Sequence, residues 1–250
     1  MSGHSHWATI RRKKAAVDAK KGKLFSKLAR AIIVAAKDGG GDPAMNLPLR
    51  YAIDAALGAN MTRDAVERSV KKGTGELAGT TYEEITYEGY APGGVAVMVQ
   101  TLTDNRNRTG AEMRKLFEVR GGNLAVVGSV AWNFEKKGLI IVSAAKADED
   151  TLMELAIEAG ADDLSAADDA FEIACEVNRF EAVKKALADA EIEPDSAELT
   201  SLPKQTVPIN DASAARKLLE FLEQLDDHDD VQNVYANFDI AEDVMASLAG

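Results

Sequence analysis

The stretch ITYEGYAPGGVAVMVQTL, residues 85–102, marks the point where this sequence changes from helical to strand periodicity. Apolar and polar residues alternate from Ile85 to Tyr90, and Ala91-Pro92-Gly93-Gly94 is typical of a turn. A short apolar run, Val95–Leu102, follows the turn. We interpret the two runs as the paired strands of a hairpin, which predicts a body built on sheets.

Strands and helices continue to alternate beyond this hairpin. Thr109 and Glu112 have the spacing of a capping box, which predicts a helix that continues to about Arg120. Periodicity predicts further strands at 129–135, 139–143, 170–177, 197–208 and 231–238, and further helices at 149–159, 179–190 and 212–225. This order predicts two α+β sandwiches, each with an antiparallel sheet and helices on one face.

The residues before the hairpin read as helices. Periodic apolar residues predict a helix over 23–37, with Leu24, Leu28, Ala31, Ile32 and Ala35 on one face and Lys23, Lys27, Arg30 and Lys37 on the other. A second helix is expected over 46–59, and a third from a Thr62 N-cap to a Gly73 C-cap. The three helices predict a small bundle, and the Gly/Thr-rich segment 73–81 predicts a domain boundary.

Charge is divided unequally along the chain. The 250 residues carry a formal net charge of −12, but residues 1–75 hold 15 bases and 6 acids, net +9, and residues 76–250 carry net −21. Such a division indicates one end that binds a polyanion and a body that repels one.

The opening arm has the residue types of a nucleic-acid contact. We expect its bases to meet phosphates, and we expect two histidines and a tryptophan to stack on or hydrogen-bond to bases. Because no Asn or Gln cluster accompanies these bases, the composition favours phosphate contact over the reading of a base sequence. The predicted contact residues are His4, His6, Trp7, Arg11, Arg12, Lys13, Lys14, Lys20, Lys21, Lys23, Lys27 and Arg30.

A second polar stretch interrupts the acidic body. Asn105, Arg106, Asn107 and Arg108 lie between a predicted strand and a predicted helix. Two interpretations stay open: these residues cap and turn the chain, or they form a second contact loop for RNA, protein or phosphate.

Other chemistries receive less support from the sequence. The three histidines and one cysteine lack the spacing of a metal site, so we expect no metal and no cofactor. Cys175 lies in an apolar run and is expected in the core. Absence of a long apolar segment, of a signal sequence and of disulfide patterning indicates a cytoplasmic protein. The acidic clusters near 162, 168 and 226–230 leave a metal-dependent phosphotransferase or hydrolase as a lesser alternative.

Several long motifs resemble the YebC/PmpR family, whose members are known as probable transcriptional regulators and include a mitochondrial translational activator of cytochrome oxidase. The resemblance covers nearly the full chain. It is carried by the segments 3–14, 42–50, 60–73, 87–97, 102–109, 121–134 and 231–238.

The resemblance implies an α+β multidomain fold with an N-terminal three-helix bundle and two ferredoxin-like α+β sandwiches, one inserted in the other. It places the basic arm and bundle at 1–79, one α+β domain at 80–132 plus 207–246, and the inserted domain at 133–206. It implies no catalytic residues.

We therefore expect a non-enzymatic, cytoplasmic, nucleic-acid-binding regulator of gene expression. The family favours a DNA-binding transcriptional regulator acting on a promoter. The residues suit ribosomal RNA equally well, so a ribosome-associated translation factor is the alternative. A module that binds only protein partners through its acidic domains is a further hypothesis. We expect neither a membrane nor a small-molecule substrate as a partner.

Overall fold

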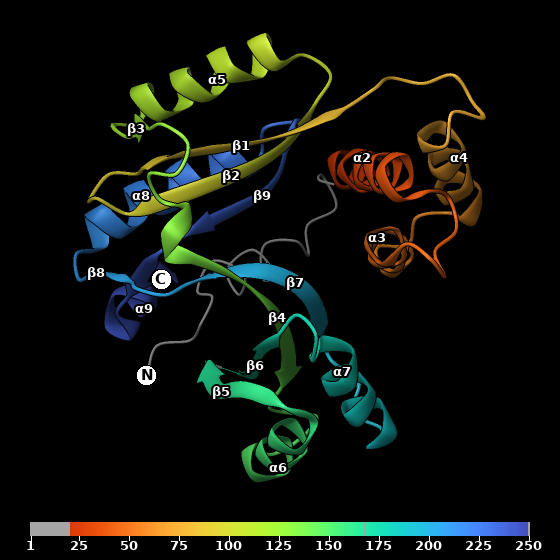
Figure 1. The fold of residues 1–250 in the computed structure, drawn as a ribbon. Helices are drawn as coiled ribbons and strands as arrows, with labels where there is room; N and C mark the ends of the chain where they lie inside the picture. The colour runs from red at the N-terminus through yellow and green to blue at the C-terminus, as the bar shows by residue number, and fades with distance from the viewer. Residues whose placement is uncertain (1–20, 168, 250) are drawn as a thin grey trace. The chain divides into compact units, whose positions relative to one another are not determined.

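The computed structural model describes residues 21–167 and 169–249, which divide into two compact units (Figure 1). Of the described residues, one unit contains 21–129 and 213–234, and the other contains 130–212 and 235–249 with its gap at 168. The chain therefore passes from the first unit to the second, returns to the first for residues 213–234, and ends in the second. The division into three domains stays a prediction.

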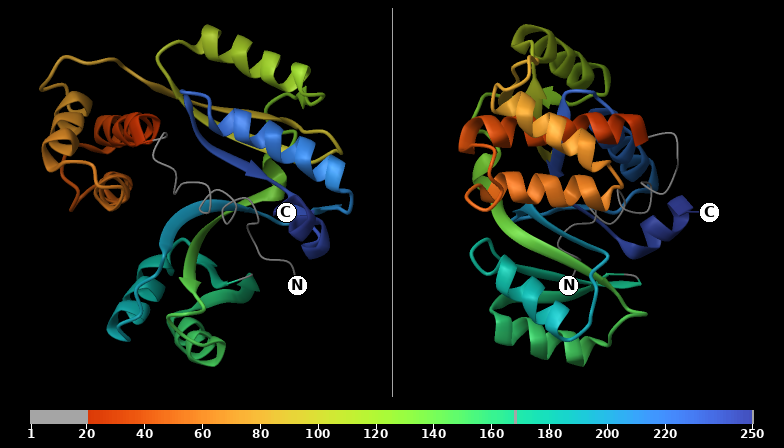
Figure 2. Two further views of the ribbon diagram at one scale, coloured as in Figure 1. Left: turned by 180° about the vertical axis from the view of Figure 1, so that it is seen from behind. Right: turned by 90° about the vertical axis from the view of Figure 1, so that its right-hand side faces the viewer.

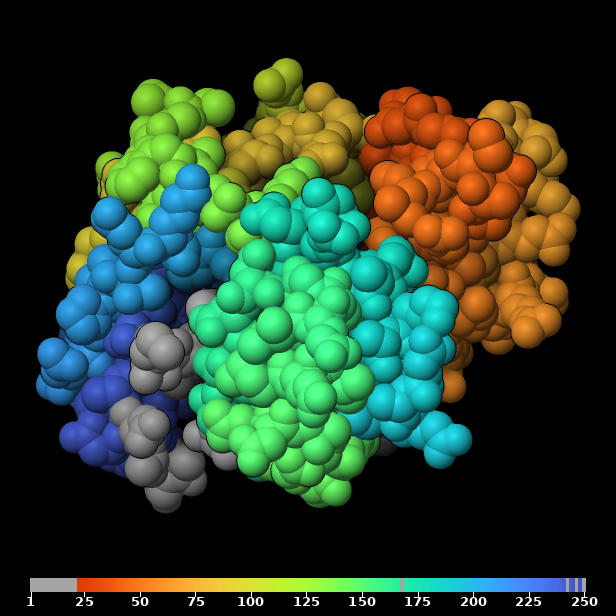
Figure 3. All heavy atoms as spheres, turned by 60° about the horizontal axis from the view of Figure 1, so that its bottom comes forward, coloured from red at the N-terminus to blue at the C-terminus, as the bar shows by residue number. Residues whose placement is uncertain are grey.

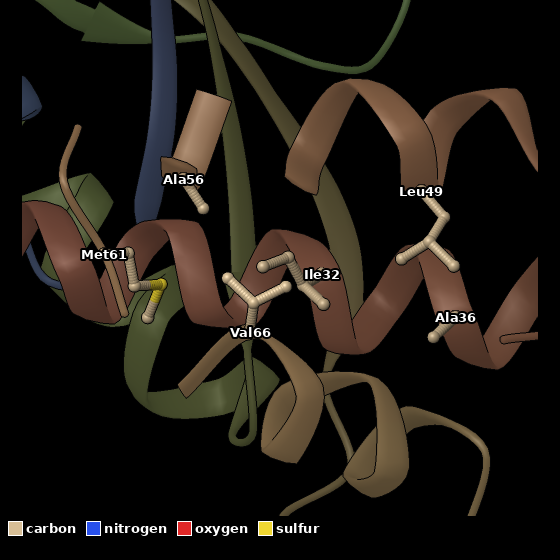
Figure 4. Close-up of a cluster of buried hydrophobic side chains, with 6 residues drawn as sticks. All are labelled: Ile32, Ala36, Leu49, Ala56, Met61 and Val66. Carbon is tan, nitrogen blue, oxygen red and sulfur yellow. The ribbon is translucent and has the colours of Figure 1, made fainter. Parts of the chain in front are cut away.

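The first unit begins with a three-helix bundle, as the sequence predicts: α2 (Lys21–Gly39), α3 (Leu47–Gly58) and α4 (Arg63–Gly73). Thr62 is the N-cap of α4, and its hydroxyl accepts a hydrogen bond from the Ala65 amide at 3.3 Å. Gly73 is the last residue of α4 rather than its cap. The buried core of the bundle consists of Ile32, Ala36, Leu49, Ala56, Met61 and Val66 (Figure 4).

Asn46 holds the turn between the first two helices. Its side-chain oxygen accepts from the Leu49 amide at 3.1 Å and caps α3, while its Nδ2 donates to the carbonyls of Ala35 at 2.7 Å and Gly40 at 2.8 Å. A Cβ on Gly39 would lie 2.6 Å from Asn46 Nδ2, so a larger residue there would displace this clamp. The amide of Asn46 thus fixes how α3 folds back on α2.

The buried face of α2 is wider than the predicted one and only overlaps it, sharing Leu28, Ile32 and Ala35. Ile32 and Ala36 are buried together with Ile33, whereas Leu24 is 42% exposed and Ala31 lies outside the core cluster. Phe25 and Leu28 pack against the core. The reason is that α2 is contacted by both other helices, so its apolar surface is wider than one stripe.

A four-stranded sheet follows in the same unit, in the order β3-β1-β2-β9. The predicted hairpin is confirmed as β1 (Glu83–Tyr90) and β2 (Ala96–Thr103), paired antiparallel from Glu83↔Thr103 to Tyr90↔Ala96. The short strand β3 (Asn123–Leu124) pairs with the end of β1. β9 (Val231–Ala236) comes from far along the chain and lies beside β2.

Helices α5 (Arg106–Val119) and α8 (Ala212–Asp226) pack together in this unit. The rings of Phe117 and Phe221 meet edge to face, with centroids 5.1 Å apart. Gly89 on β1 permits this packing, because a Cβ there would lie 2.5 Å from the Phe117 ring. The capping box predicted at Thr109 is wrong: α5 begins at Arg106, and Thr109 is buried inside the helix. Asn105 is the actual N-cap.

The second unit contains a ferredoxin-like arrangement. Its elements are β4 (Phe134–Ser143), α6 (Glu149–Ala159), β5 (Ala161–Ala167), β6 (Ala170–Glu176), α7 (Phe180–Asp189) and β7 (Ser196–Pro203). The sheet order is β5-β6-β4-β7, with every neighbouring pair antiparallel. Helices α6 and α7 lie side by side (Figure 2). This segment forms one continuous mass of atoms (Figure 3). The predicted α+β multidomain class is confirmed.

The first and last strands of this arrangement pair at the residues where the chain enters and leaves it. Phe134 at the start of β4 pairs with Pro203 at the end of β7. Just outside, the Asn133 side chain accepts from the Gln205 amide and donates to the Gln205 carbonyl, both at 2.9 Å. The parallel pair β8 (Val207–Ile209) and β10 (Phe238–Ile240) and the helix α9 (Glu242–Ala249) follow.

Several predicted strands differ from the observed ones. Residues 129–135 are not a strand, because Asn133 closes the 3-10 turn η2 (Ala131–Asn133) and the strand β4 begins only at Phe134. The predicted strand 197–208 is two strands in different sheets. The sequence analysis missed β5 because Asp162 and Asp163 resemble loop residues; in the structure they lie in a paired strand.

Candidate nucleic-acid interface

The described part of the chain contains four of the predicted contact bases. Lys21 begins α2, and Lys23, Lys27 and Arg30 follow on the same helix. The other predicted contacts lie outside the described residues; they are His4, His6, Trp7, Arg11, Arg12, Lys13, Lys14 and Lys20. Their role in binding stays a prediction, as does that of the bases on α2.

Lys23, Lys27 and Arg30 form a stripe along α2, which we call the basic stripe. The spacing of four and three residues places the three side chains on one face of the helix. This stripe contacts residues 226–230, which we call the acidic loop. The Nζ of Lys23 lies 3.7 Å from an Asp229 carboxylate oxygen, the Nζ of Lys27 lies 3.6 Å from Asp226, and the Arg30 guanidinium lies 3.1 Å from Asp230.

Backbone carbonyls of the acidic loop take part in the same contact. Lys23 donates to the Asp227 carbonyl at 3.1 Å, and Lys27 and Arg30 donate to the carbonyls of Asp226 and Asp229. This loop begins at Asp226, the last residue of α8, where the helix dipole adds negative potential. The basic stripe therefore faces a row of oxygens that includes both carboxylates and carbonyls.

The Lys23 end of the stripe is much more exposed than the rest. The Lys23 side chain is 56% exposed and its partner Asp229 is 72% exposed, whereas Arg30 and Asp230 are only 19% and 4% exposed. Arg30 also stacks over Tyr82, with its guanidinium carbon 5.4 Å from the ring centroid. An exposed ion pair contributes little to stability, but a buried one is costly to break. The Lys23 end of the contact is therefore the weaker one.

Asp230 is the centre of a buried network that sequence reasoning missed. One oxygen accepts from Arg30, and the other accepts from Arg108 and from the Thr109 hydroxyl, both at 2.7 Å. Burial alone would raise the pKa of the Asp230 carboxyl, but the Thr109 and Arg108 hydrogen bonds and the nearby guanidinium charges outweigh burial, so its pKa is lowered. Asp230 thus stays ionised at neutral pH.

A signal for this contact was present in the sequence. The run Asp226-Asp227-His228-Asp229-Asp230 is the densest acidic cluster of the body, and the helix at 23–37 is strongly basic. Their opposite charges were compatible with a contact. Nothing in the local pattern showed that two segments about 200 residues apart would meet, because the contact depends on β9 returning beside β2.

Glu112, His228 and Asp230 bring one potential metal-ligand atom each within 4.8 Å of one another. His228 Nδ1 accepts from the Asp230 amide at 3.2 Å, which assigns the ring proton to Nε2, and Nε2 donates to Glu112 at 2.9 Å. Both Asp230 oxygens are bonded to arginine. A metal ion would have to displace these cations, so the group fits a hydrogen-bond network better than a metal site.

The predicted second contact loop is the first turn of α5. Asn105 caps the helix by accepting from the Arg108 amide at 3.1 Å. Arg108 binds Asp104 at 2.9 Å as well as Asp230, so its guanidinium is engaged within the protein. Arg106 and Asn107 are exposed. A contact role for this turn stays a prediction, carried by Arg106 and Asn107.

The remaining residues that the sequence offered for chemistry are acidic residues of the body and Cys175. Asp162 on β5 lies 2.9 Å from the Nζ of Lys137 on β4, which is separated from β5 by β6 in the same sheet. Asp168 lies outside the described residues. Cys175 is fully buried, and burial raises the pKa of its thiol to about 11, which makes it a poor nucleophile. Among the described helices, none combines the length and apolar character that crossing a membrane requires.

The comparisons with known protein families cover both the arm and the body. A model described as the TACO1/YebC protein N-terminal domain matches residues 5–76, and a model of the TACO1/YebC second and third domain matches residues 82–238. The chain belongs to the TACO1/YebC family. This confirms the resemblance drawn from the sequence motifs.

Full-length relatives extend this TACO1/YebC assignment. The chain is 51% identical to a probable transcriptional regulatory protein of Dictyoglomus turgidum over 250 residues, covering 100% of both chains. It is 52% identical to a protein of the same name from Rubrobacter xylanophilus, again over 100% of both. The crystal structure of a conserved hypothetical protein, Aq1575 from Aquifex aeolicus, has a TM-score of 0.86 at 49% identity, covering 95% of this chain and 98% of that one.

Proposed function

We propose that this TACO1/YebC protein is a non-enzymatic regulator of gene expression that binds nucleic acid through its basic N-terminal arm and α2. The single observation that carries the proposal is the charge division: residues 1–75 carry net +9 in a chain of net −12. The names of its relatives, probable transcriptional regulatory proteins, agree with this class of function. Such a protein would act in the cytoplasm.

Promoter DNA is the target that those names favour, and we propose it as the first candidate. Contacts from Lys and Arg side chains to phosphates would supply most of the affinity, because such contacts release counterions. If about six phosphates are neutralised, log K should fall against log salt concentration with a slope near −5 on duplex DNA. An affinity independent of salt would overturn the proposal.

Ribosomal RNA is the second candidate, favoured by the chemistry of the basic stripe. Its described members are two lysines and an arginine, which suit phosphates on either nucleic acid and specify no base. A translation factor on the ribosome would need no sequence reading in the protein. Crosslinking in cells with recovery of both DNA and RNA separates the candidates: discrete promoter peaks support a transcriptional regulator, and reads from one rRNA region support a translation factor.

A matched pair of variants tests the interface itself. Changing four arm bases to Ala should weaken binding at least tenfold and reduce the salt slope by up to about four. The variant combines Arg11→Ala, Arg12→Ala, Lys13→Ala and Lys14→Ala. The control removes the same charge from exposed bases of the body, namely Lys136→Ala, Lys204→Ala, Arg216→Ala and Lys217→Ala. Equal loss in both would mean that net charge, not the arm, supplies the affinity.

The hydrolase alternative has less support. Its candidate carboxylates are held by bases: Asp162 by Lys137, Asp226 by Lys27 and Asp230 by two arginines. Mg²⁺ would compete with these cations for the same oxygens. Calorimetric titration with Mg²⁺ or Mn²⁺ that detects tight binding, lost on Asp226→Asn, would favour this alternative over ours.

A further inference from the structure

The acidic loop occupies the surface of α2 that the proposed function assigns to phosphates. Lys23, Lys27 and Arg30 each contact a carboxylate of this loop, and each also donates to one of its backbone carbonyls. These oxygens are the kind of acceptors that a phosphate backbone would offer to the same cations. The two contacts cannot use the same ammonium and guanidinium protons at once.

We propose that the acidic loop 226–230 is an internal competitor that covers the basic stripe, and that nucleic acid must displace it to bind α2. This inference rests on the proposed function, since it concerns the regulation of the same surface. It assigns to the acidic cluster a role in binding rather than in metal chemistry. It also predicts that the protein binds polyanions more weakly than its basic arm and helix would permit.

The contact is built to open from one end. The Lys23–Asp229 pair is mostly exposed, and the Lys27–Asp226 pair has side-chain exposures of 16% and 23%. The exposed Lys23–Asp229 pair is weak and is screened by salt, so a phosphate replaces it first. The more buried Lys27–Asp226 pair exchanges only after the Lys23 end has opened. Asp230 is different, because Arg108 and Thr109 hold it from α5 independently of α2. We therefore expect Asp226 and Asp229 to exchange, while Asp230 keeps its place in the body.

The geometry argues that the loop retains its shape when α2 is released. The Asp227 amide donates to the Glu223 carbonyl at 2.8 Å, and the His228 amide donates to the Leu225 carbonyl at 3.2 Å. The Asp230 amide donates to His228, and the Asp230 carbonyl accepts from the Leu102 amide at 2.8 Å on β2. These bonds are independent of the basic stripe. Displacement therefore separates two preformed surfaces instead of unfolding one.

The test neutralises the exchangeable acids and leaves Asp230 intact. The full-length variant Asp226→Asn/Asp229→Asn should bind a short RNA or a short DNA duplex about three- to twentyfold more tightly than wild type, since two carboxylates no longer compete for Lys23 and Lys27. Fluorescence anisotropy over a range of salt concentrations measures this change. The advantage of the variant should shrink as salt rises, because salt screens the wild-type ion pairs as well.

A matched control separates local competition from net charge. Glu154→Gln/Glu158→Gln removes two exposed carboxylates from α6 and changes the net charge equally. We expect this control to tighten binding no more than about twofold, because neither carboxylate belongs to the loop that pairs with the basic stripe and exposed charges are screened by salt. Equal tightening by both double variants would overturn the inference while leaving the proposed function intact. If no variant, nor wild type, binds either nucleic acid, the proposed function itself fails.

A second measurement observes the displacement directly in the wild-type protein. Carbodiimide-driven amine coupling, read by mass spectrometry, reports how accessible the Asp226 carboxylate is. Adding RNA or duplex DNA should increase coupling at Asp226, because its partner Lys27 moves to phosphate. Unchanged or reduced coupling at saturating nucleic acid would show that the loop stays on α2, which contradicts the inference. Thermal unfolding of the double variant confirms that it remains folded during the comparison.

Discussion

The basic helix of the bundle and the ferredoxin-like sheet both carry ion pairs, but the two kinds of pair have different structural roles. On the sheet, Lys137 binds Asp162 and Glu176, and Glu176 is its direct cross-strand partner. Strand register fixes the Lys137–Glu176 pair, and Asp162 joins it from β5 in the same sheet. On α2, the partners of Lys23 and Arg30 are about 200 residues distant in sequence and belong to a loop. The first kind of pair supports a fold, whereas the second can be exchanged for another anion.

The largest expected effect comes from core substitutions in the helical bundle and in the ferredoxin-like arrangement. Leu49 in the bundle and Leu152 on α6 are both fully buried. Substitution of either by Ala should lower the free energy of unfolding by about 2–5 kcal/mol. Leu49→Ala should also weaken nucleic-acid binding at least tenfold, because it loosens the support of α2, whereas Leu152→Ala should leave affinity within about twofold. Urea unfolding and anisotropy measure the two quantities. Equal losses of affinity would place the binding surface outside the bundle.

Asp230→Asn should produce the next largest effect. The amide would present a donor to Arg30, Arg108 or Thr109, and we expect a loss of about 2–4 kcal/mol in the free energy of unfolding. Asp229→Asn, on an exposed side chain, is the control and should cost under about 1 kcal/mol. Similar costs for the two would contradict the buried network.

The same variant has a defined pH dependence. Because the pKa of Asp230 is lowered in the folded protein, its contribution is present above the unfolded value of about 4 and is lost as pH falls through the folded pKa. Wild type should therefore lose stability below about pH 4 more steeply than Asp230→Asn. Parallel curves would show that Asp230 does not supply this stability.

The smallest effect compares one substitution at two lysines. Lys137→Met leaves Asp162 and Glu176 without the base that separates them and should cost about 1–2 kcal/mol. Lys23→Met should cost under about 0.5 kcal/mol, because Lys23 is 56% exposed. Chemical denaturation at low and high salt measures both. A larger cost at Lys23 would contradict the view that its pair is exchangeable.

Local sequence patterns correctly predicted the elements whose formation depends on residues close together in the sequence. The N-cap at Thr62, the three bundle helices and the 85–102 hairpin follow from spacing and turn residues, and the structure confirms them. The predicted start of α5 was wrong because Thr109 fits a capping box in sequence, but its hydroxyl donates a hydrogen bond to Asp230 instead. Asn105, two residues after β2, caps the helix instead. A tertiary hydrogen bond from the Thr109 hydroxyl thus took precedence over the local capping pattern.

The sequence predicted the bases of the candidate site on α2 but not the acidic residues that they contact. Spacing correctly placed Lys23, Lys27 and Arg30 on one helix, because helical periodicity is local. It could not supply their partners, since Asp226, Asp229 and Asp230 reach α2 only through the return of β9 to the sheet. The acidic cluster 226–230 is evident in the sequence. Whether its carboxylates face solvent, bind a metal or pair with lysine depends on the topology of the fold.

The pairing of Phe134 with Pro203, closed by Asn133 and Gln205, means that the ferredoxin-like segment enters and leaves through adjacent residues. Neighbouring strands lie only about 5 Å apart, so a two-residue turn could bridge the ends if the segment were removed. Entry and exit through adjacent residues set no length on the segment between them. A reporter domain whose own ends lie close together could therefore be grafted at this place.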